Sequence, residues 1–130
     1  MAAYVDTSAL VKLVVAEAET PALRAWLAEV DGEPVACDLV RTELMRAVRR
    51  VVPDRAVQAR AVLDSLVLVE CRPAVFDAAG RLDPTDLRSL DAIHLATALD
   101  LGDDLEHLVT YDDRMAGAAE ANGVAVVTPR

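Results

Sequence analysis

Short apolar runs and longer helical stretches alternate along this chain. The runs that have strand character cover residues 2–6, 35–37, 67–71, 107–110 and 124–127. The stretches with helical character cover residues 7–15, 20–30, 39–51, 53–66, 73–82 and 89–99, followed by a last helix that ends near residue 121. Strands that alternate with helices favour a parallel sheet covered on both faces. We therefore predict a three-layer α/β fold, with a central parallel sheet of about five short strands, in a single domain over residues 1–130.

The helix from Ser89 to Leu99 is the centre of this pattern. It is apolar almost all the way round, which is typical of a buried helix. Ser89 is a candidate N-cap, and Gly102 suits the end of the helix. Asp91 then falls in the first turn, at the edge of the core, where its simplest role is to complement the helix dipole. The candidate N-caps of two earlier helices are Thr20 and Asp38.

Four carboxylates occupy positions that a parallel sheet brings together. Asp6 and Asp112 directly follow predicted strands, while Glu43 and Asp91 lie in the first turns of helices that begin at the same edge. Ligands of such sheets bind outside the carboxyl ends of the strands, where the strand order reverses. The sequence therefore predicts one acidic pocket at this edge.

Glu43 is the least expected of these acids. It lies on an apolar helical stripe formed by Val40, Leu44, Ala47, Val48 and Val51. A carboxylate on a core-facing stripe is costly unless it is paired or bound to a cation. The alternative to a cation site is an ion pair with Arg46 or Arg50.

Crowded carboxylates repel one another unless a cation lies between them. An all-oxygen ligand set suits Mg²⁺ or Mn²⁺. Such ions activate water and neutralise a phosphodiester under attack. The expected chemistry is metal-dependent hydrolysis of a phosphate ester.

Composition limits the partners. The net charge of −9 disfavours wholesale binding to nucleic acid or to an anionic membrane. No stretch resembles a transmembrane segment or a signal peptide, so we expect a cytoplasmic protein that does not bind membranes. Cys37 and Cys71 stand alone, without the spacing of a zinc site, and are expected to be reduced and buried.

Basic residues are concentrated between residues 41 and 60, which carry six arginines and two acids. Arginine binds phosphate through its planar fork, so this segment is the candidate RNA-contacting surface. A solvated helix face with scattered ion pairs is the alternative. The arginines of this segment that we predict to contact RNA are Arg41, Arg46, Arg49 and Arg50.

Four sequence segments resemble the acidic motifs of PIN-domain nucleases. They are Tyr-Val-Asp-Thr-Ser-Ala-Leu around Asp6, Arg-Thr-Glu-Leu around Glu43, Leu-Asp-Ala-Ile-His-Leu-Ala-Thr-Ala around Asp91, and Val-Thr-Tyr-Asp-Asp-Arg-Met around Asp112. Their order and the chain length resemble the VapC-type toxins of bacterial toxin–antitoxin pairs.

The resemblance implies a metal-dependent endoribonuclease that cleaves structured cellular RNA such as tRNA or rRNA. Asp6, Glu43, Asp91 and Asp112 would be catalytic and would bind Mg²⁺ or Mn²⁺. Ser8 and Thr110 would orient the site, and Asp113 would be an auxiliary acid. The implied partners are a VapB-type antitoxin and a second copy of the chain. The alternatives are an RNA-processing nuclease outside any toxin pair and a catalytically idle PIN-like binding protein.

His94 and Trp26 carry side chains that could have functional roles of their own. His94 lies three residues after Asp91, and we expect it to be a core histidine with one satisfied nitrogen rather than a catalytic base. Trp26, together with its neighbours Leu23 and Leu27, is expected in the core or on a partner surface.

Overall fold

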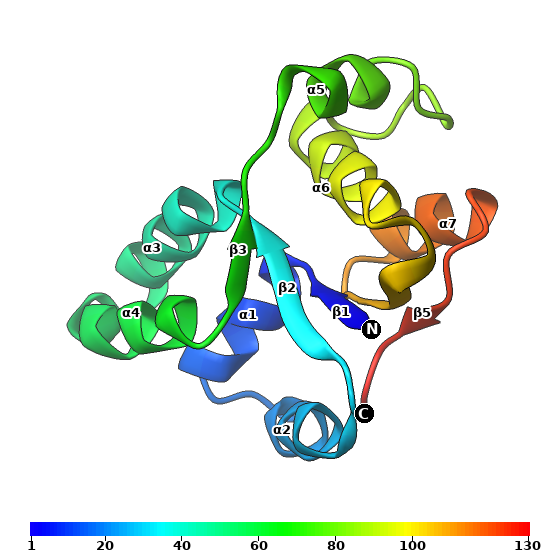
Figure 1. Cartoon of the computed structure of the whole chain (residues 1–130). Coiled ribbons are helices and arrows are strands. Elements are labelled where there is room, and N and C mark those ends of the chain that lie inside the picture. The colour runs from blue at the N-terminus through cyan, green and yellow to red at the C-terminus, as the bar shows by residue number, and fades with distance from the viewer.

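A five-stranded parallel sheet forms the centre of the molecule in the computed structural model, which describes all 130 residues (Figure 1). The strand order is β3-β2-β1-β4-β5. The strands are β1 (Ala2–Val5), β2 (Glu33–Cys37), β3 (Val67–Val69), β4 (Leu105–Val109) and β5 (Val126–Val127). The predicted parallel sheet of five short strands is confirmed. The order reverses between β1 and β4, which places the expected ligand site at their carboxyl ends.

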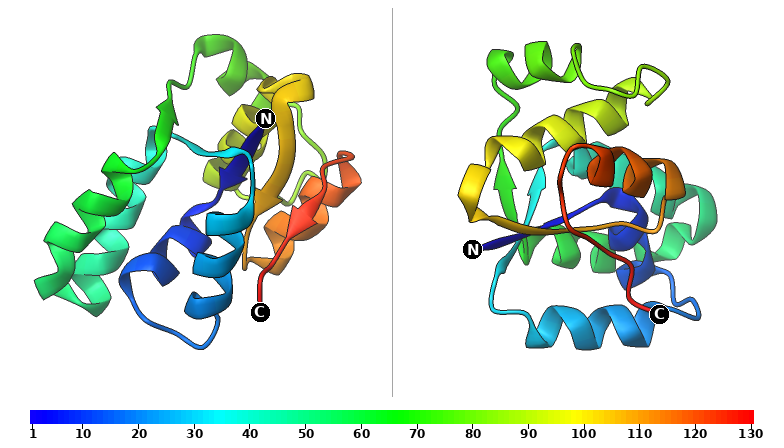
Figure 2. Two further views of the ribbon diagram at one scale, coloured as in Figure 1. Left: turned by 60° about the horizontal axis from the view of Figure 1, so that its bottom comes forward. Right: turned by 90° about the vertical axis from the view of Figure 1, so that its right-hand side faces the viewer.

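Seven α-helices flank the sheet, which confirms the three-layer arrangement (Figure 2). They are α1 (Thr7–Val14), α2 (Thr20–Glu29), α3 (Leu39–Val51), α4 (Ala56–Asp64), α5 (Pro73–Ala79), α6 (Ser89–Asp100) and α7 (Asp113–Ala121). Short 3₁₀ turns cover Pro53–Arg55 and Gly102–Asp104. The stretch predicted as one helix from Pro53 is therefore a 3₁₀ turn followed by α4. No helix is long and apolar enough to span a membrane.

The two faces of the sheet have separate cores because successive side chains of β1 point to opposite sides. Ala3 and Val5 join a core with residues of α1 to α4, whereas Tyr4 joins a core with residues of α6 and α7. Helix α5 lies outside α6 and packs on it through a small third cluster. Helix α6 is thus covered by the sheet on one side and by α5 on the other, which explains its apolar composition.

Three predicted N-caps are wrong. Helix α6 begins at Ser89 itself, after Arg88 in extended conformation, and has no side-chain cap. The hydroxyl of Thr20 donates to the Lys12 carbonyl and accepts from the Glu17 N–H instead of capping α2. Asp38 has helical backbone angles and pairs with Arg41. In each case another bond uses the capping oxygen, or the backbone lacks the extended geometry of a cap.

Of two further predictions, the end of α6 at Gly102 is confirmed, whereas the apolar stripe of α3 is shorter than predicted. Gly102 has φ of +60°, so it ends α6 as predicted in the left-handed conformation that glycine adopts easily. Val51 is 61% exposed, because the apolar stripe of α3 is buried only through Val40, Leu44 and Val48. The predicted stripe therefore leaves the core at Val51, the last residue of α3.

Candidate active site

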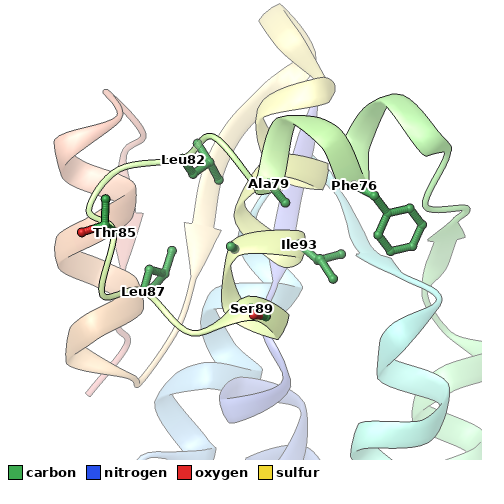
Figure 3. A pocket seen from close by; sticks show the side chains of 9 residues that line it. Phe76, Ala79, Leu82, Thr85, Leu87, Ser89 and Ile93 are labelled. Carbon is green, nitrogen blue, oxygen red and sulfur yellow. The ribbon is translucent and has the colours of Figure 1, made fainter.

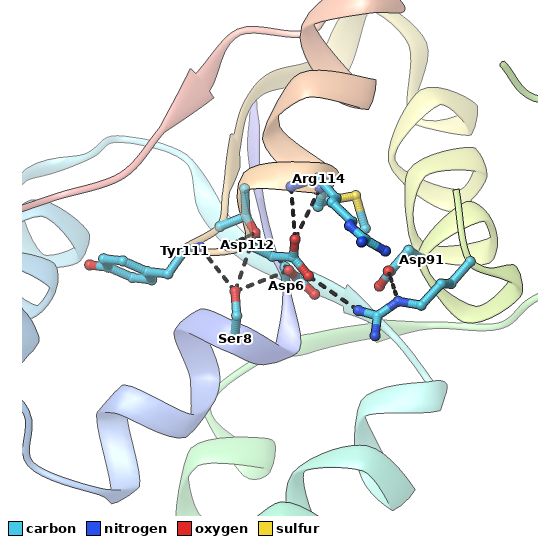
Figure 4. A network of polar contacts seen from close by, with 9 residues as sticks. Asp6, Ser8, Asp91, Tyr111, Asp112 and Arg114 are labelled. Atoms are coloured by element: carbon cyan, nitrogen blue, oxygen red, sulfur yellow. Dashed lines mark hydrogen bonds and ion pairs between the residues drawn. The ribbon is translucent and has the colours of Figure 1, made fainter. Parts of the chain in front are cut away.

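Asp6 lies at the junction of β1 and α1 and is 4% exposed. Thr110 Oγ1 donates to its Oδ2 at 2.7 Å, and Ser8 Oγ donates to the same oxygen at 3.1 Å (Figure 4). Burial raises the pKa of Asp6 above its ordinary value of 3.8, while the hydrogen bonds and His94 lower it in part and the nearby Asp91 raises it. The structure thus holds a carboxylate in a place where it is costly without a cation.

Ser8 and Thr110 join the ends of β1 and β4. The Tyr111 N–H donates to Ser8 Oγ at 2.9 Å, and the Asp112 N–H donates to Thr110 Oγ1 at 3.1 Å. Both hydroxyls therefore receive a backbone donor from the segment after β4 and direct their own protons toward Asp6. The orienting role of these two hydroxyls stays a prediction.

Asp112 is the N-cap of α7. Its Oδ1 accepts from the N–H groups of Arg114 at 2.9 Å and Met115 at 3.3 Å (Figure 4). Its Oδ2 accepts from Arg88 Nη2 at 3.3 Å. One oxygen of this carboxylate is fixed by the helix, and the other faces the space shared with Asp6 and Asp91.

Arg88 connects the acids of this space. Its Nε donates to Asp91 Oδ2 at 3.1 Å, while its Nη2 reaches Asp112. Asp91, then Asp112 and Asp6, raise the pKa of the guanidinium above its ordinary value. The side chain of Arg88 is 65% exposed, against 14% for Asp91. The exposed guanidinium of Arg88 therefore bonds Asp91 and Asp112 and lies near enough to Asp6 to be influenced by its charge.

Glu43 lies beside this group but has its own partners. Thr7 Oγ1 donates to Glu43 Oε1 at 3.0 Å, and His94 Nε2 donates to the same oxygen at 2.5 Å. With Arg88 and Asp91, Glu43 lines one surface hollow. The alternative ion pair of Glu43 with Arg46 or Arg50 is absent from this structure. A residue on α6, across the sheet edge from α3, pairs with Glu43 instead.

His94 is fully buried, and both of its ring nitrogens have partners. Tyr4 Oη lies 2.7 Å from Nδ1, and Glu43 accepts from Nε2. Burial lowers the pKa of His94, but contacts with Cys37 and Glu43 outweigh this effect and raise it from 6.5 to about 10. The expectation of one satisfied nitrogen is wrong, because Glu43 reaches the second nitrogen from α3.

The ligand atoms at this edge fit a divalent metal in their chemistry. Asp6, Asp91 and Asp112 offer only carboxylate oxygens, and they surround a cationic group in the form of Arg88. Such a set suits a hard cation. No three His, Cys, Asp or Glu side chains are close enough to ligate one ion as they stand. In their chemistry the residues fit a metal, and the carboxylates would have to move closer together to share one ion.

The remaining predicted residues lie outside this group. Asp113 is the first residue of α7 and lines a separate hollow with Pro84, Asp86 and Arg114. Arg41 pairs with Asp38. Arg46, Arg49 and Arg50 form no ion pair and together surround a hollow on α3. Trp26 packs against the core of α1 to α4, as expected.

Two contributors to the site were missed from the sequence, Arg88 and Thr7. Arg88 lies three residues before Asp91, a spacing that places a base beside an acid at the start of a helix. Thr7 follows Asp6 and contacts Glu43 only because α1 packs against α3. Tertiary packing, which no local spacing reveals, creates that second contact.

An apolar hollow lies next to the site but lacks its chemistry. It is bounded by α5, the following loop and α6 (Figure 3). No lining side chain is titratable, so this hollow supplies neither a metal ligand nor an acid or base. The lining residues are Phe76, Ala79, Gly80, Leu82, Thr85, Leu87, Ser89, Ala92 and Ile93.

The fold and this acidic edge define an α/β protein whose site lies at the switch point of a parallel sheet, where the strand order reverses. The PIN domain family matches residues 3–121. Ribonuclease VapC46 of Mycobacterium tuberculosis is 47% identical over 128 residues, covering 98% of each chain. Ribonuclease VapC47 of the same species is 40% identical, covering 97% of this chain and 96% of the relative. The chain therefore belongs to the PIN domain family, together with the VapC ribonucleases.

Solved structures share the fold at lower sequence identity. Mycobacterium tuberculosis VapC20 superposes with a TM-score of 0.79 at 19% identity, covering 98% of this chain and all of that one. A toxin–antitoxin complex from Klebsiella pneumoniae gives a TM-score of 0.76 at 22% identity, covering 99% of this chain and 98% of the other. The fold of the sheet and its helices is thus that of VapC toxins.

Proposed function

We propose that this chain is the toxin endoribonuclease of a VapBC-type pair and hydrolyses phosphodiester bonds of structured cellular RNA with Mg²⁺ or Mn²⁺. The observation that carries the proposal is the gathering of Asp6, Asp91 and Asp112 around one cationic group at the switch point. The relatives that cover nearly the whole chain are ribonucleases. VapC20, which shares the fold, cleaves the sarcin-ricin loop, and this supports rRNA within the proposed substrate class of structured rRNA or tRNA.

Asp6, Asp91 and Asp112 would hold the metal, with Glu43 as a further ligand. When bound, a divalent metal activates water and neutralises charge on the phosphate under attack. The chain's residues keep the ligands ready for this role. Thr110 and Ser8 stabilise the ionised form of the buried Asp6, and α7 fixes one oxygen of Asp112 while leaving the other toward the site. Arg88, once displaced, carries a planar donor group suited to a phosphate at the same edge.

RNA would extend from the acidic site along α3. Arg46 and Arg50 follow Glu43 by three and seven residues, so they lie about 4.5 and 10.5 Å further along the helix at a rise of about 1.5 Å per residue. Neither arginine, nor Arg49 beside them, has an acidic partner. These free cations support phosphate contacts. Arg41 is a weaker candidate because Asp38 already binds it.

The proposed partners follow from the same assignment. They are a VapB-type antitoxin that blocks the acidic site, a second copy of the chain in a homodimer, and the RNA substrate. The toxin–antitoxin complex from Klebsiella pneumoniae, which shares this fold, supports the antitoxin partner. The proposed location is the cytoplasm, where the substrate RNA is.

The test is cleavage of total cellular RNA by the purified protein with Mg²⁺, with Mn²⁺ and with EDTA. Asp91→Asn keeps the shape of the side chain but removes the charge, so we expect it to abolish cleavage while circular dichroism shows an intact fold. Asp113→Asn is the matched control, because Asp113 lies at the same edge but outside the carboxylate group. Cleavage by Asp91→Asn at the wild-type rate would contradict the site. Failure to cleave under any metal would contradict the function.

A further inference from the structure

A chain of buried hydrogen bonds runs from β2 to the acidic site. The Cys37 N–H donates to Tyr4 Oη at 3.2 Å, and Tyr4 Oη lies 2.7 Å from His94 Nδ1. His94 Nε2 then donates to Glu43, since a carboxylate only accepts. Tyr4 and His94 are both fully buried, and their rings meet edge-on with centroids 5.9 Å apart. The imidazole therefore has one orientation, fixed at both nitrogens.

This polar chain lies in a core that is otherwise aliphatic. Tyr4 packs in the same core as Leu95 and Ala98, which flank His94 on α6. A buried imidazole costs free energy unless its polar atoms are bonded, whereas an aliphatic side chain in its place carries no such cost. His94 differs from an apolar residue in its two bonded nitrogens. Nδ1 serves the buried Tyr4 hydroxyl inside the core, whereas Nε2 reaches the acidic site at Glu43, so the bond that bears on the site is the one to that carboxylate.

The two hydrogen bonds to Glu43 fall on one oxygen. Thr7 at 3.0 Å and His94 both donate to Oε1, and no side chain or N–H group of the protein donates to Oε2. The carboxylate is thus held from one side. Oε2 keeps its lone pairs for a ligand of the hollow that Glu43 shares with Asp91 and Arg88.

We propose that His94 is a positioning residue for the metal site: it fixes Glu43 through Oε1 and so presents Oε2 to the divalent ion. This inference rests on the proposed function, because it assigns Glu43 to the metal. The His94 side chain is 1% exposed, so it reaches neither substrate nor solvent and acts only through Glu43. Hydrogen bonds of this kind to a ligating side chain orient it and strengthen the site. Helix α6 then supplies Asp91 directly and orients Glu43 of α3 from its next turn.

The experiment compares Mn²⁺ binding, measured by calorimetry, in the wild type and in variants of α6. His94→Ala should bind Mn²⁺ about 10- to 100-fold more weakly, the range found when such supporting bonds are removed. His94→Gln should recover most of the affinity, because its amide can still donate to Glu43. Thr97→Val is the control, since Thr97 is buried in the same helix but donates to the Ile93 carbonyl.

A second variant protects the test against a folding defect. Thr7→Val removes the other hydrogen bond to Oε1 on a less buried side chain, and it should weaken Mn²⁺ binding in the same direction. At saturating metal, KM for RNA should be unchanged in both Thr7→Val and His94→Gln, because neither residue contacts the substrate. These readouts separate positioning from a purely structural role, which would change stability without changing metal affinity.

The outcomes also separate this inference from the proposed function. Wild-type Mn²⁺ affinity in a folded His94→Ala protein, or in Thr7→Val should His94→Ala not fold, would overturn the role of His94 and leave the nuclease intact. A His94-dependent Mn²⁺ site in a protein that cleaves no RNA would support the role of His94 and contradict the nuclease. Loss of affinity in Thr97→Val equal to that in His94→Ala would also overturn the inference.

Discussion

Thr110 donates to Asp6 at 2.7 Å and thereby joins the end of β4 to the end of β1 where the strand order reverses. This bond stabilises the ionised form of a carboxylate whose pKa burial raises. Thr110→Val removes the donor and keeps the shape. The pKa of Asp6 should then rise further, and the acidic limb of the cleavage profile should move to higher pH. A pH–rate profile that matches the wild type would show that Asp6 is not the titrating ligand.

Asp6 also makes the metal-free protein less stable. Its folded pKa lies above the ordinary value of 3.8, so the folded state binds the proton more tightly than the unfolded state. Stability from this group is therefore present at low pH and is lost as the pH rises through the folded pKa. Asp6→Asn should raise the stability of the metal-free protein at pH 7 by about 1 kcal/mol, which is roughly 4 °C in Tm for a chain of this size.

The measurement for Asp6→Asn is a thermal melt in EDTA at pH 7 and at pH 4. The gain over the wild type should shrink at the lower pH, where the wild-type carboxyl approaches its neutral form. A variant that melts below the wild type at pH 7 would show that the charge of Asp6 does not destabilise the metal-free protein.

Arg88 binds Asp91 and Asp112, two of the acids that would hold the metal of the proposed function. Arg88→Gln removes this internal cation, so Mn²⁺ should bind more tightly than in the wild type. Calorimetry at low salt measures the difference. Arg72→Gln is the matched control, because Arg72 pairs with Asp100 at the other end of α6. Equal or weaker Mn²⁺ binding in Arg88→Gln would show that the guanidinium does not occupy the cation position.

The arginines of α3 predict a salt-dependent interaction with RNA. Replacing Arg46, Arg49 and Arg50 by Gln should weaken RNA binding and flatten its dependence on salt. The log–log slope should fall by about 0.7 for each phosphate of a single strand that the variant no longer neutralises. Binding to an inactive Asp91→Asn protein, titrated from low to high salt, gives the slope. Arg24→Gln on α2, which bonds the Leu13 carbonyl, should leave the slope unchanged.

Much of the fold could be predicted from the sequence because its signals are local. Five apolar runs separated by helical stretches indicated the parallel sheet, and Gly102 marked the end of α6. Caps were harder, because a serine or threonine near a helix start forms whichever hydrogen bond tertiary packing offers. Thr20, for example, bonds the Lys12 carbonyl of the preceding helix.

In the candidate site, too, local signals could be predicted and tertiary contacts could not. Asp6, Asp91 and Asp112 could be placed at one edge from the positions of strands and helix starts alone. The partners of Glu43 could not, because spacing along α3 indicates only neighbours on that helix, whereas Thr7 and His94 arrive from α1 and α6. The role of Arg88 as the cation among the acids likewise depends on α7 bringing Asp112 beside it.

The position of Arg88 among the acids bears on whether folding or metal binding comes first. In many small metalloproteins the ion is needed before the chain can fold, and chelators then unfold them. Here a residue of the chain itself supplies positive charge to the acids, so we expect the chain to fold without the ion. For the proposed nuclease, metal binding would then follow folding as a separate and reversible step, set by the free concentration of the ion.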